Sequence, residues 1–465
     1  MPIPETVPSP PVTETAATQP QPPVAEPAPP EPSRPKGLPP SAWVSTTYFA
    51  EGLPYMLVRA LTGVYFTDLG LRESIIGYLN FLGLPWNFKF TWAPLVDWVG
   101  TKRKWMLGIQ GALVAGFGLL ALLVALGPKS APVCRSLAAM AHVFDPVTGW
   151  SHRTILLLLI GLLVVLAFLS ATHDVSIDAY YIEGLPEKKD QAKYTGLRVT
   201  AYRVAALSAK SALVLFAWWL NFGLGALALG VLFVAHLFGA PRFAEDLEPR
   251  RLERPKLWSH LEETLTSYLA QDRVWVILAF IPLYKVGDAL LFGMNTTFLM
   301  RELHVTRPQL SWLSLLGTFA AIAGTLGGAW LIERHGLKRM MWPLTLAMNL
   351  TLWAYVYLAW ATPSAATTRG VWLIAVIHVY ENLAAALGDA ALTIFLIYTC
   401  KPAHKAAHFA VGTAIASLAS TVFGGFSGAY VEAHGYLSLY LVAFAASVPA
   451  MGLLFFLPLT DRAKR

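Results

Sequence analysis

The chain has 465 residues, of which 55% are hydrophobic and 14% are charged, and it carries a net charge of +7. Soluble domains contain about 25% charged residues, so this composition argues against a soluble protein. The positive charge does not indicate a nucleic-acid-binding protein, because the lysines and arginines lie between hydrophobic runs and form no continuous basic face. The composition favours an integral membrane protein.

The first 40 residues differ from the rest of the chain. They contain 15 of the 32 prolines and no apolar core of the kind that a cleavable signal peptide needs. We expect residues 1–40 to form a disordered, proline-rich cytoplasmic tail, with a ligand for an SH3-like partner as an alternative. Residues 461–465 are expected to form a second, short cytoplasmic tail.

Twelve hydrophobic runs follow the tail, each close to the length of about 20 residues that crosses a bilayer. The runs lie at 43–67, 74–98, 104–127, 153–183, 194–220, 223–240, 274–300, 308–332, 338–360, 370–399, 406–431 and 436–459. The predicted fold is therefore an all-α integral membrane protein with twelve transmembrane helices. A polar central loop at 241–273 divides it into two six-helix halves, 41–240 and 274–460.

The lysines and arginines predict the orientation, because they are enriched in cytoplasmic loops. With the N-terminus inside the cell, 22 of the 35 fall in cytoplasmic segments, seven on the opposite side and six within spans. We therefore expect both termini and the central loop to be cytoplasmic. On this topology Cys134 and Cys400 lie on opposite sides of the membrane, so neither a disulfide nor a cysteine metal site is expected.

The two halves repeat one loop motif at a constant offset of 236 residues. The paired positions are Asp97 with Glu333, Gly100 with Gly336, and Arg103 with Arg339. In each loop the acid ends a helix, the glycine permits a tight turn and the basic residue stays in the cytosol. If the acid meets a basic group or a helix N-terminus in one conformation only, the loops act as gates. Anchoring by positive charge is the alternative.

Other matches extend the repeat. Residues 68–71 align with 302–305, and Asp174 aligns with Asp389. A parallel repeat of six helices predicts a pseudo-two-fold axis along the membrane normal, with the solute between the halves. Glycines four residues apart, at Gly324 and Gly328 and again at 424 and 428, predict close helix packing.

Charged residues within spans are costly and need a reason. Six of them are basic: Arg59, Lys89, Arg198, Arg203, Lys210 and Lys285. They can be structural partners of the acids, or they can line a wet cavity in which cations bind a carboxylate or phosphate and tyrosines face a sugar or peptide. The candidate substrate-binding residues are Tyr55, Arg59, Lys89, Arg198, Tyr202, Lys285, Asn295 and Glu381.

Acids within the same spans are candidates for carrying a proton. They are Glu51, Asp174, Asp178 and Asp389. Asp174 and Asp178 are four residues apart and so share a helix face. The alternative is a permanently ionised partner of Arg198 or Arg203.

Several segments together resemble the AmpG-type permeases, a branch of the major facilitator superfamily that also contains acetyl-CoA transporters. The segments are 49–55, 87–97, 173–180, 381–383 and 407–411. The resemblance implies import of anhydromuropeptides driven by the proton gradient. It places Lys89, Asp97, Asp174, Asp178 and Glu381 at family positions.

We therefore expect a monomeric symporter of the bacterial inner membrane that imports a large polar or anionic solute, such as an anhydromuropeptide, by alternating access. Its expected partners are the solute, protons and the lipid bilayer, with no nucleic acid, cofactor or metal. A siderophore or acyl-CoA type of anion is an alternative solute, and a non-transporting receptor is an alternative class. No nucleophile–base arrangement or phosphate-binding loop indicates an enzyme.

Overall fold

The computed structural model describes residues 37–127, 140–243, 262–263, 265–401 and 405–459. Across these ranges the regular structure is helical, apart from one isolated β-bridge between Phe144 and Ser151. The all-α prediction is therefore confirmed for the described part of the chain. The predicted tails, most of the central loop and Cys134 lie outside it.

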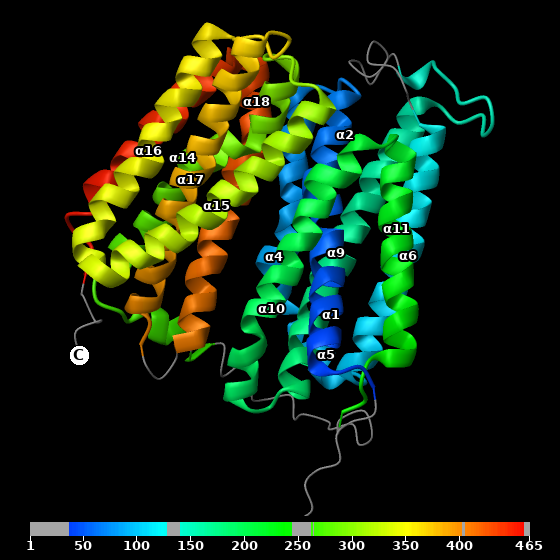
Figure 1. The fold of residues 1–465 in the computed structure, drawn as a ribbon, viewed down its shortest axis with the longest axis horizontal. Coiled ribbons are helices and arrows are strands. Elements are labelled where there is room, and N and C mark those ends of the chain that lie inside the picture. Colours follow the sequence, from blue (N-terminus) through cyan, green and yellow to red (C-terminus); the bar gives the residue numbers. More distant parts are fainter. Residues whose placement is uncertain (1–36, 128–139, 244–261, 264, 402–404, 460–465) are drawn as a thin grey trace, which may run out of the picture. The chain divides into compact units, whose positions relative to one another are not determined.

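Figure 1 shows the helices of both halves. The N-terminal half contains α1 (Pro40–Met56), η1 (Leu57–Leu61), α2 (Thr62–Asp68), α3 (Glu73–Tyr78), η2 (Leu79–Gly83), α4 (Leu84–Phe88), η3 (Lys89–Thr91), α5 (Ala93–Trp98), α6 (Lys102–Leu126), α9 (His152–Gly184), α10 (Lys188–Leu207), η4 (Ser208–Ala212), η5 (Leu213–Leu215) and α11 (Trp218–Gly239). The C-terminal half contains α14 (Val274–Arg301), α15 (Arg307–His335), α16 (Leu337–Ala361), α17 (Thr368–Thr399) and α18 (Lys405–Leu453).

Eight helices within the described ranges are individually long and apolar enough to cross a membrane. One of them, α18, turns at Gly435, whose φ of 78° and ψ of 168° are not helical, and so supplies two spans. Three more spans are built from shorter pieces: α1 to α2, α3 to α5, and α10 to η5. These helices account for the twelve predicted spans.

Local sequence explains why the second span is broken. Pro85 lies in the first turn of α4 and Pro94 in the first turn of α5. Proline lacks a backbone N–H and is favoured in the first turn of a helix, so each of these two prolines begins a new helix after a 3-10 segment. The chain crosses this span as a series of short helices.

One predicted boundary is wrong by several residues. The hydropathy placed the fifth span at 194–220 and the sixth at 223–240. In the structure η5 ends at Leu215 and α11 begins at Trp218, after the extended residue Ala217. Trp218 and Trp219 are apolar, so hydropathy shows no break where the backbone turns.

Backbone angles support the internal repeat. Gly70 and His304, which the repeat aligns, both have positive φ, of 77° and 57°. A positive φ is uncommon outside glycine, so its recurrence at His304 indicates that both halves require the same turn. Gly100 and Gly336 likewise have φ of 75° and 84°, as expected for the two matched loops.

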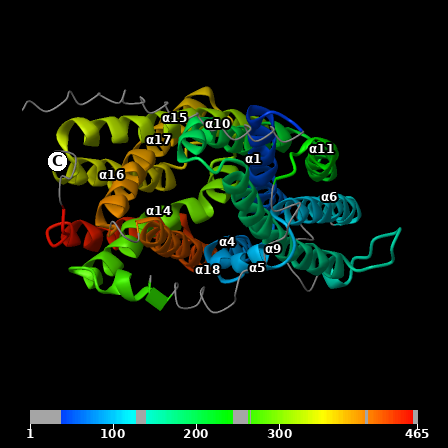
Figure 2. The same ribbon diagram turned by 90° about the horizontal axis from the view of Figure 1, so that it is seen from below.

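Each half has its own hydrophobic interior. Two clusters of buried residues come from residues 43–243 and two from residues 277–457. Both views place α6 and α11 on one side and α16 on the other (Figure 1 and Figure 2). The described unit is therefore two helical bundles side by side.

Glycines set the close helix contacts that the sequence predicted. A Cβ added at Gly324 would overlap the carbonyl oxygen of Leu383 on α17. One added at Gly428 of α18 would overlap the Glu73 carbonyl oxygen and lie 2.8 Å from Gly77 Cα, both on α3. The first contact lies within one half, whereas the second joins the two halves.

Candidate functional site

A cavity of about 370 Å³ lies between the two halves, where the repeat predicts a solute site. Its size is within the range of about 300–1,000 Å³ that is typical of small-molecule sites. The polar residues that line it from the N-terminal half are Arg59, Asn80 and Lys210. Those that line it from the C-terminal half are Asp288, Asn295, Thr296, Thr297, Ser314, Thr318, His378, Asn382 and Ser420.

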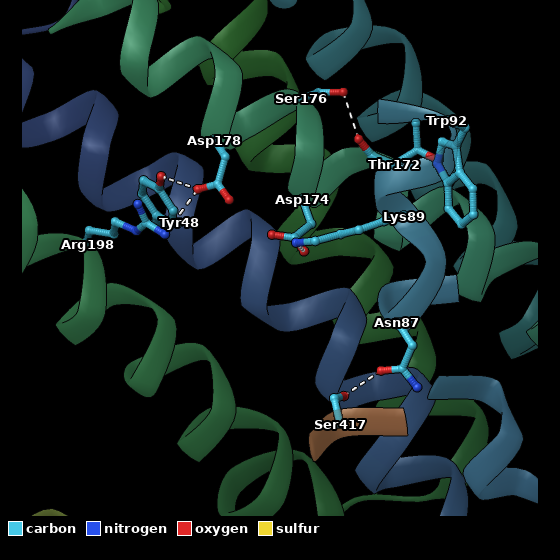
Figure 3. A network of polar contacts seen from close by, with 10 residues as sticks. All are labelled: Tyr48, Asn87, Lys89, Trp92, Thr172, Asp174, Ser176, Asp178, Arg198 and Ser417. Carbon is cyan, nitrogen blue, oxygen red and sulfur yellow. Dashed lines mark hydrogen bonds and ion pairs between the residues drawn. The ribbon is translucent and has the colours of Figure 1, made fainter. Parts of the chain in front are cut away.

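A network of acids and bases lies within the N-terminal half (Figure 3). The Tyr48 hydroxyl donates a hydrogen bond of 2.7 Å to Asp178 Oδ1, and Arg198 Nη2 lies 3.1 Å from the same oxygen. The Arg198 guanidinium also stacks on the Tyr48 ring, 4.6 Å from its centroid. Lys89 forms an ion pair with Asp174, one turn before Asp178 on α9.

Glu51 of α1 adds a third carboxyl group to this network. It is only 8% exposed and interacts electrostatically with Asp174 and Asp178. Its Oε2 atom has no hydrogen-bond partner in the described part of the chain. Three of the four proposed proton carriers, Glu51, Asp174 and Asp178, are thus brought together.

Close packing of α1 on α10 makes this geometry possible. A Cβ added at Gly52 would lie 3.0 Å from Tyr202 Cδ2, so glycine at this position lets α10 approach α1. The neighbouring rings then meet: the Tyr55 ring lies 4.9 Å from Trp86 and 6.3 Å from Tyr202, centroid to centroid. Tyr55 and Tyr202, both candidate substrate-binding residues, are therefore neighbours in the structure.

The C-terminal half has a separate charge cluster. Lys285 Nζ lies 2.5 Å from Asp288 Oδ2 and 2.8 Å from Asp389 Oδ1. Glu381 is 1% exposed and accepts a hydrogen bond of 3.0 Å from the Asn382 amide. Asp389 therefore lies apart from the other three proposed proton carriers.

The structure divides the predicted substrate-binding residues into two groups. Arg59 and Asn295 line the cavity. The remaining six are not among its lining residues: Tyr55, Lys89, Arg198, Tyr202, Lys285 and Glu381. The candidate binding residues did not include Lys210, Asp288, His378 or Asn382, although Lys210 was one of the six basic residues considered for a wet cavity.

The two matched loops are partly described. The side chain of Asp97 lies outside the described part, and those of Glu333 and Arg339 are exposed. Arg103 donates to the carbonyl oxygens of Leu237 at 2.8 Å and Ala240 at 3.2 Å, and so satisfies the C-terminal end of α11 in its own half. The gating role of the loops remains a prediction.

Polar contacts join the halves at the end predicted to be extracellular. Arg301 of α14 pairs with Glu73 of α3 at 2.7 Å and donates to the Thr67 carbonyl oxygen at 2.9 Å. Arg72 pairs with Glu432 of α18. These contacts, with the α3–α18 glycine contact, hold the bundles together at this end.

Two comparisons with known sequences agree with this structure. Residues 47–199 match the family described as acetyl-coenzyme A transporter 1. The chain is 29% identical over 438 residues to the anhydromuropeptide permease of Escherichia coli (strain K12), which spans 90% of this chain and 79% of that protein. It is 23% identical over 431 residues to the putative transporter AmpG 4 of Rickettsia conorii, which spans 88% and 94% of the two chains.

Solved structures show the same fold. The nucleoside transporter NupG superposes with a TM-score of 0.65 at 14% identity, over 90% of this chain and 99% of that one. The D-xylose-proton symporter superposes with a TM-score of 0.63 at 11% identity, over 91% and 98%.

The chain is a multi-pass membrane protein with the fold of solved membrane transporters. Its sequence is similar to the AmpG-type permeases over most of its length. The predicted fold, the predicted family resemblance and the prediction that the chain is not an enzyme are confirmed.

Proposed function

We propose that this transporter imports a large polar or anionic solute, such as an anhydromuropeptide, together with protons. The observation that carries the proposal is the cavity between the halves, which presents Arg59 and Lys210 from one half and the amides of Asn295 and Asn382 from the other. Cations suit the carboxylates of a sugar-peptide, and amides suit its acetamido and peptide groups. One chain forms the whole cavity, which supports a monomeric unit.

The charge balance of the N-terminal network supports proton coupling. Three carboxyl groups, Glu51, Asp174 and Asp178, meet two cations, Lys89 and Arg198. An unpaired charge inside a membrane protein is costly, so a proton on one of the three carboxyl groups would restore neutrality. Loading and release of that proton would link the network to the movement of α1, α9 and α10.

The contacts between the halves support alternating access. The bundles are joined at the end predicted to be extracellular through Arg301 and Glu73, which corresponds to a state closed on that side. Import would require these contacts to break while the solute enters. We place both termini in the cytoplasm and the protein in a bacterial inner membrane, on the strength of the lysine and arginine distribution and the bacterial relatives.

Uptake into proteoliposomes tests the proposal. The purified chain should accumulate a radiolabelled anhydromuropeptide when the outside is more acidic, and a protonophore should abolish the accumulation. Asp178→Asn should lose gradient-driven accumulation while its amount in the membrane stays unchanged. Gradient-driven accumulation by Asp178→Asn would remove Asp178 from the coupling, and binding without accumulation by the wild type would favour a receptor.

A second candidate solute is an acyl-coenzyme A, because residues 47–199 match the acetyl-coenzyme A transporter family. Coenzyme A carries phosphates, which arginine and lysine also bind well. The same proteoliposomes distinguish the two solutes. Accumulation of radiolabelled anhydromuropeptide, and not of radiolabelled acetyl-CoA, supports the first, and accumulation of acetyl-CoA alone supports the second.

A further inference from the structure

Two spans widen into a π-helical turn where they pass the cavity. The first is η1, which contains Arg59, and the second is η4, which contains Lys210. In each turn a backbone N–H reaches back five residues, from Thr62 to the Leu57 carbonyl and from 213 to 208. Such turns are rare and frequently occur at functional sites.

A π turn changes where later side chains point. It adds one residue to a turn, and each residue of an α-helix advances by roughly 100° around the axis. Tyr48 and Glu51 precede η1 and face the acid–base network, whereas Arg59 lies within η1 and lines the cavity. Arg59 lies eight residues beyond Glu51, about 12 Å along an α-helix, and the π turn adds a rotation to this axial separation.

Neither cavity cation forms an ion pair with a described carboxylate, because Asp288, which lines the same cavity, pairs with Lys285. Lys89, Arg198 and Lys285 each bind a carboxylate. In the described part of the chain, Arg59 donates to the Asn80 carbonyl oxygen and forms no ion pair, and Lys210 has neither an ion pair nor a hydrogen bond. Two cations that line a membrane cavity without a carboxylate partner indicate that the missing anion comes with the solute.

The opposite wall carries a second unsatisfied group. Asn295 is 6% exposed and lines the cavity, and its Oδ1 atom has no hydrogen-bond partner among the described residues. A buried acceptor of this kind is costly unless a donor reaches it. An amide N–H or a hydroxyl of a bound solute would supply that donor.

We infer that Arg59 and Lys210, presented by the π turns η1 and η4, form the subsite for a carboxylate or phosphate of the solute, and that Asn295 accepts a hydrogen bond from its amide or hydroxyl group. The inference rests on the proposed function and deepens it, because it assigns the solute an orientation. The anionic group binds the N-terminal half, and the neutral polar part binds the C-terminal half.

Binding to the purified full-length chain in detergent tests the subsite with two pairs of probes. One pair is an anhydromuropeptide and the same compound with its carboxyl groups amidated, and the other is coenzyme A and pantetheine, which lacks the phosphates. Of the probe pair that the protein binds, the wild type should bind the anionic member about tenfold or more tightly than the neutral member, since hydrogen bonds to charged groups are among the strongest. In Lys210→Met and in Arg59→Met this ratio should fall toward one, and Lys210→Arg should retain it.

A matched control is Arg369→Gln, because Arg369 is exposed at the start of α17 and does not line the cavity. Its binding ratio should equal that of the wild type. Thermal unfolding checks folding, and Lys210→Met carries the test if Arg59→Met does not fold, because Lys210 forms no hydrogen bond or ion pair with a described residue that the substitution would break.

The outcomes separate the subsite from the proposed function. If folded Lys210→Met keeps the wild-type ratio of affinities for the anionic and the neutral probe, the subsite is overturned. The proposed function still stands in that case if the wild type binds the anhydromuropeptide. Selective binding of coenzyme A, with a ratio that falls in the variants, supports the subsite and overturns the muropeptide assignment. Binding of no probe by the wild type overturns both.

Discussion

Asp174 and Asp389 occupy matching positions in the two halves of the sequence, and each carboxylate binds a lysine. The lysines come from non-equivalent spans: Lys89 lies in the second span of its half, whereas Lys285 lies in the first span of the other half. The Asp174 side chain is 13% exposed and that of Asp389 is 52% exposed. The repeat has therefore kept the acid and changed both its partner and its contact with solvent.

This difference predicts unequal roles in coupling. Asp174→Asn should lower gradient-driven uptake by about tenfold or more, because asparagine cannot carry a proton and the two remaining carboxyl groups then match the two cations without one. Asp389→Asn should have a smaller effect, since solvent can screen the change. Initial rates of uptake against the imposed pH difference measure both variants. Equal losses in the two would contradict the assignment of coupling to the N-terminal network.

The Lys89–Asp174 ion pair also predicts a pattern of stability. Removing one partner of a fully buried pair costs about 3–5 kcal/mol, and the loss should be smaller here because the Lys89 side chain is 32% exposed. Lys89→Met should therefore destabilise the folded chain, and adding Asp174→Asn should recover much of the loss. Thermal unfolding of the purified protein measures both. Lys104→Gln, at an exposed position, is the control and should change the free energy of unfolding by no more than about 0.5 kcal/mol.

Much of the fold could be predicted because hydropathy and charge report directly on which segments cross a bilayer. The ion pairs were partly predictable too: Arg198 was considered as a partner of the acids, and it binds Asp178. The repeat predicted where the cavity lies, but not all the residues that line it, because a helix face drawn from a regular period of 3.6 residues shifts across a π turn. Tyr48 and Arg59 share a face in such a drawing, yet one meets Asp178 and the other lines the cavity.

The lining role of Lys210 depends on tertiary structure in the same way. Its span is a polar helix followed by the π turn η4, and η4 packs against both η1 and α15. Sequence spacing within one span carries no information on which neighbours it meets. Only the packing of the two halves shows that Lys210 faces Asp288 and Asn295 across a common cavity.

The glycine contact between α3 and α18 predicts a position that tolerates no side chain in this state. Gly428→Ala would place a methyl group against the backbone of Glu73 and Gly77, and overpacking of this kind costs about 1–3 kcal/mol. We expect the substitution to separate the halves at this end and to reduce uptake. Distances between spin labels on α3 and α18 measure the separation.

The control for this substitution is Gly108→Ala on α6, where an added Cβ would meet no atom within 4 Å. Alanine has a higher helix propensity than glycine, so this variant should be as stable as the wild type or slightly more stable. A normal distance distribution and normal uptake in Gly428→Ala would show that the close contact does not limit the closed state.

The ion pairs between the halves predict a graded shift in the conformational equilibrium. Arg301 and Glu73 have side chains that are 20% and 26% exposed, whereas Arg72 is 58% exposed in its pair with Glu432. Because solvent weakens exposed pairs, Glu73→Gln should shift the population toward separated halves by about fivefold, or about 1 kcal/mol, and Arg72→Gln by less. Spin-label distances between α3 and α14 report the populations.

Exchanging the charges in Glu73→Arg/Arg301→Glu should restore part of the closed population, although the hydrogen bond from Arg301 to the Thr67 carbonyl oxygen is lost. A larger shift in Arg72→Gln than in Glu73→Gln would show that burial does not rank these contacts.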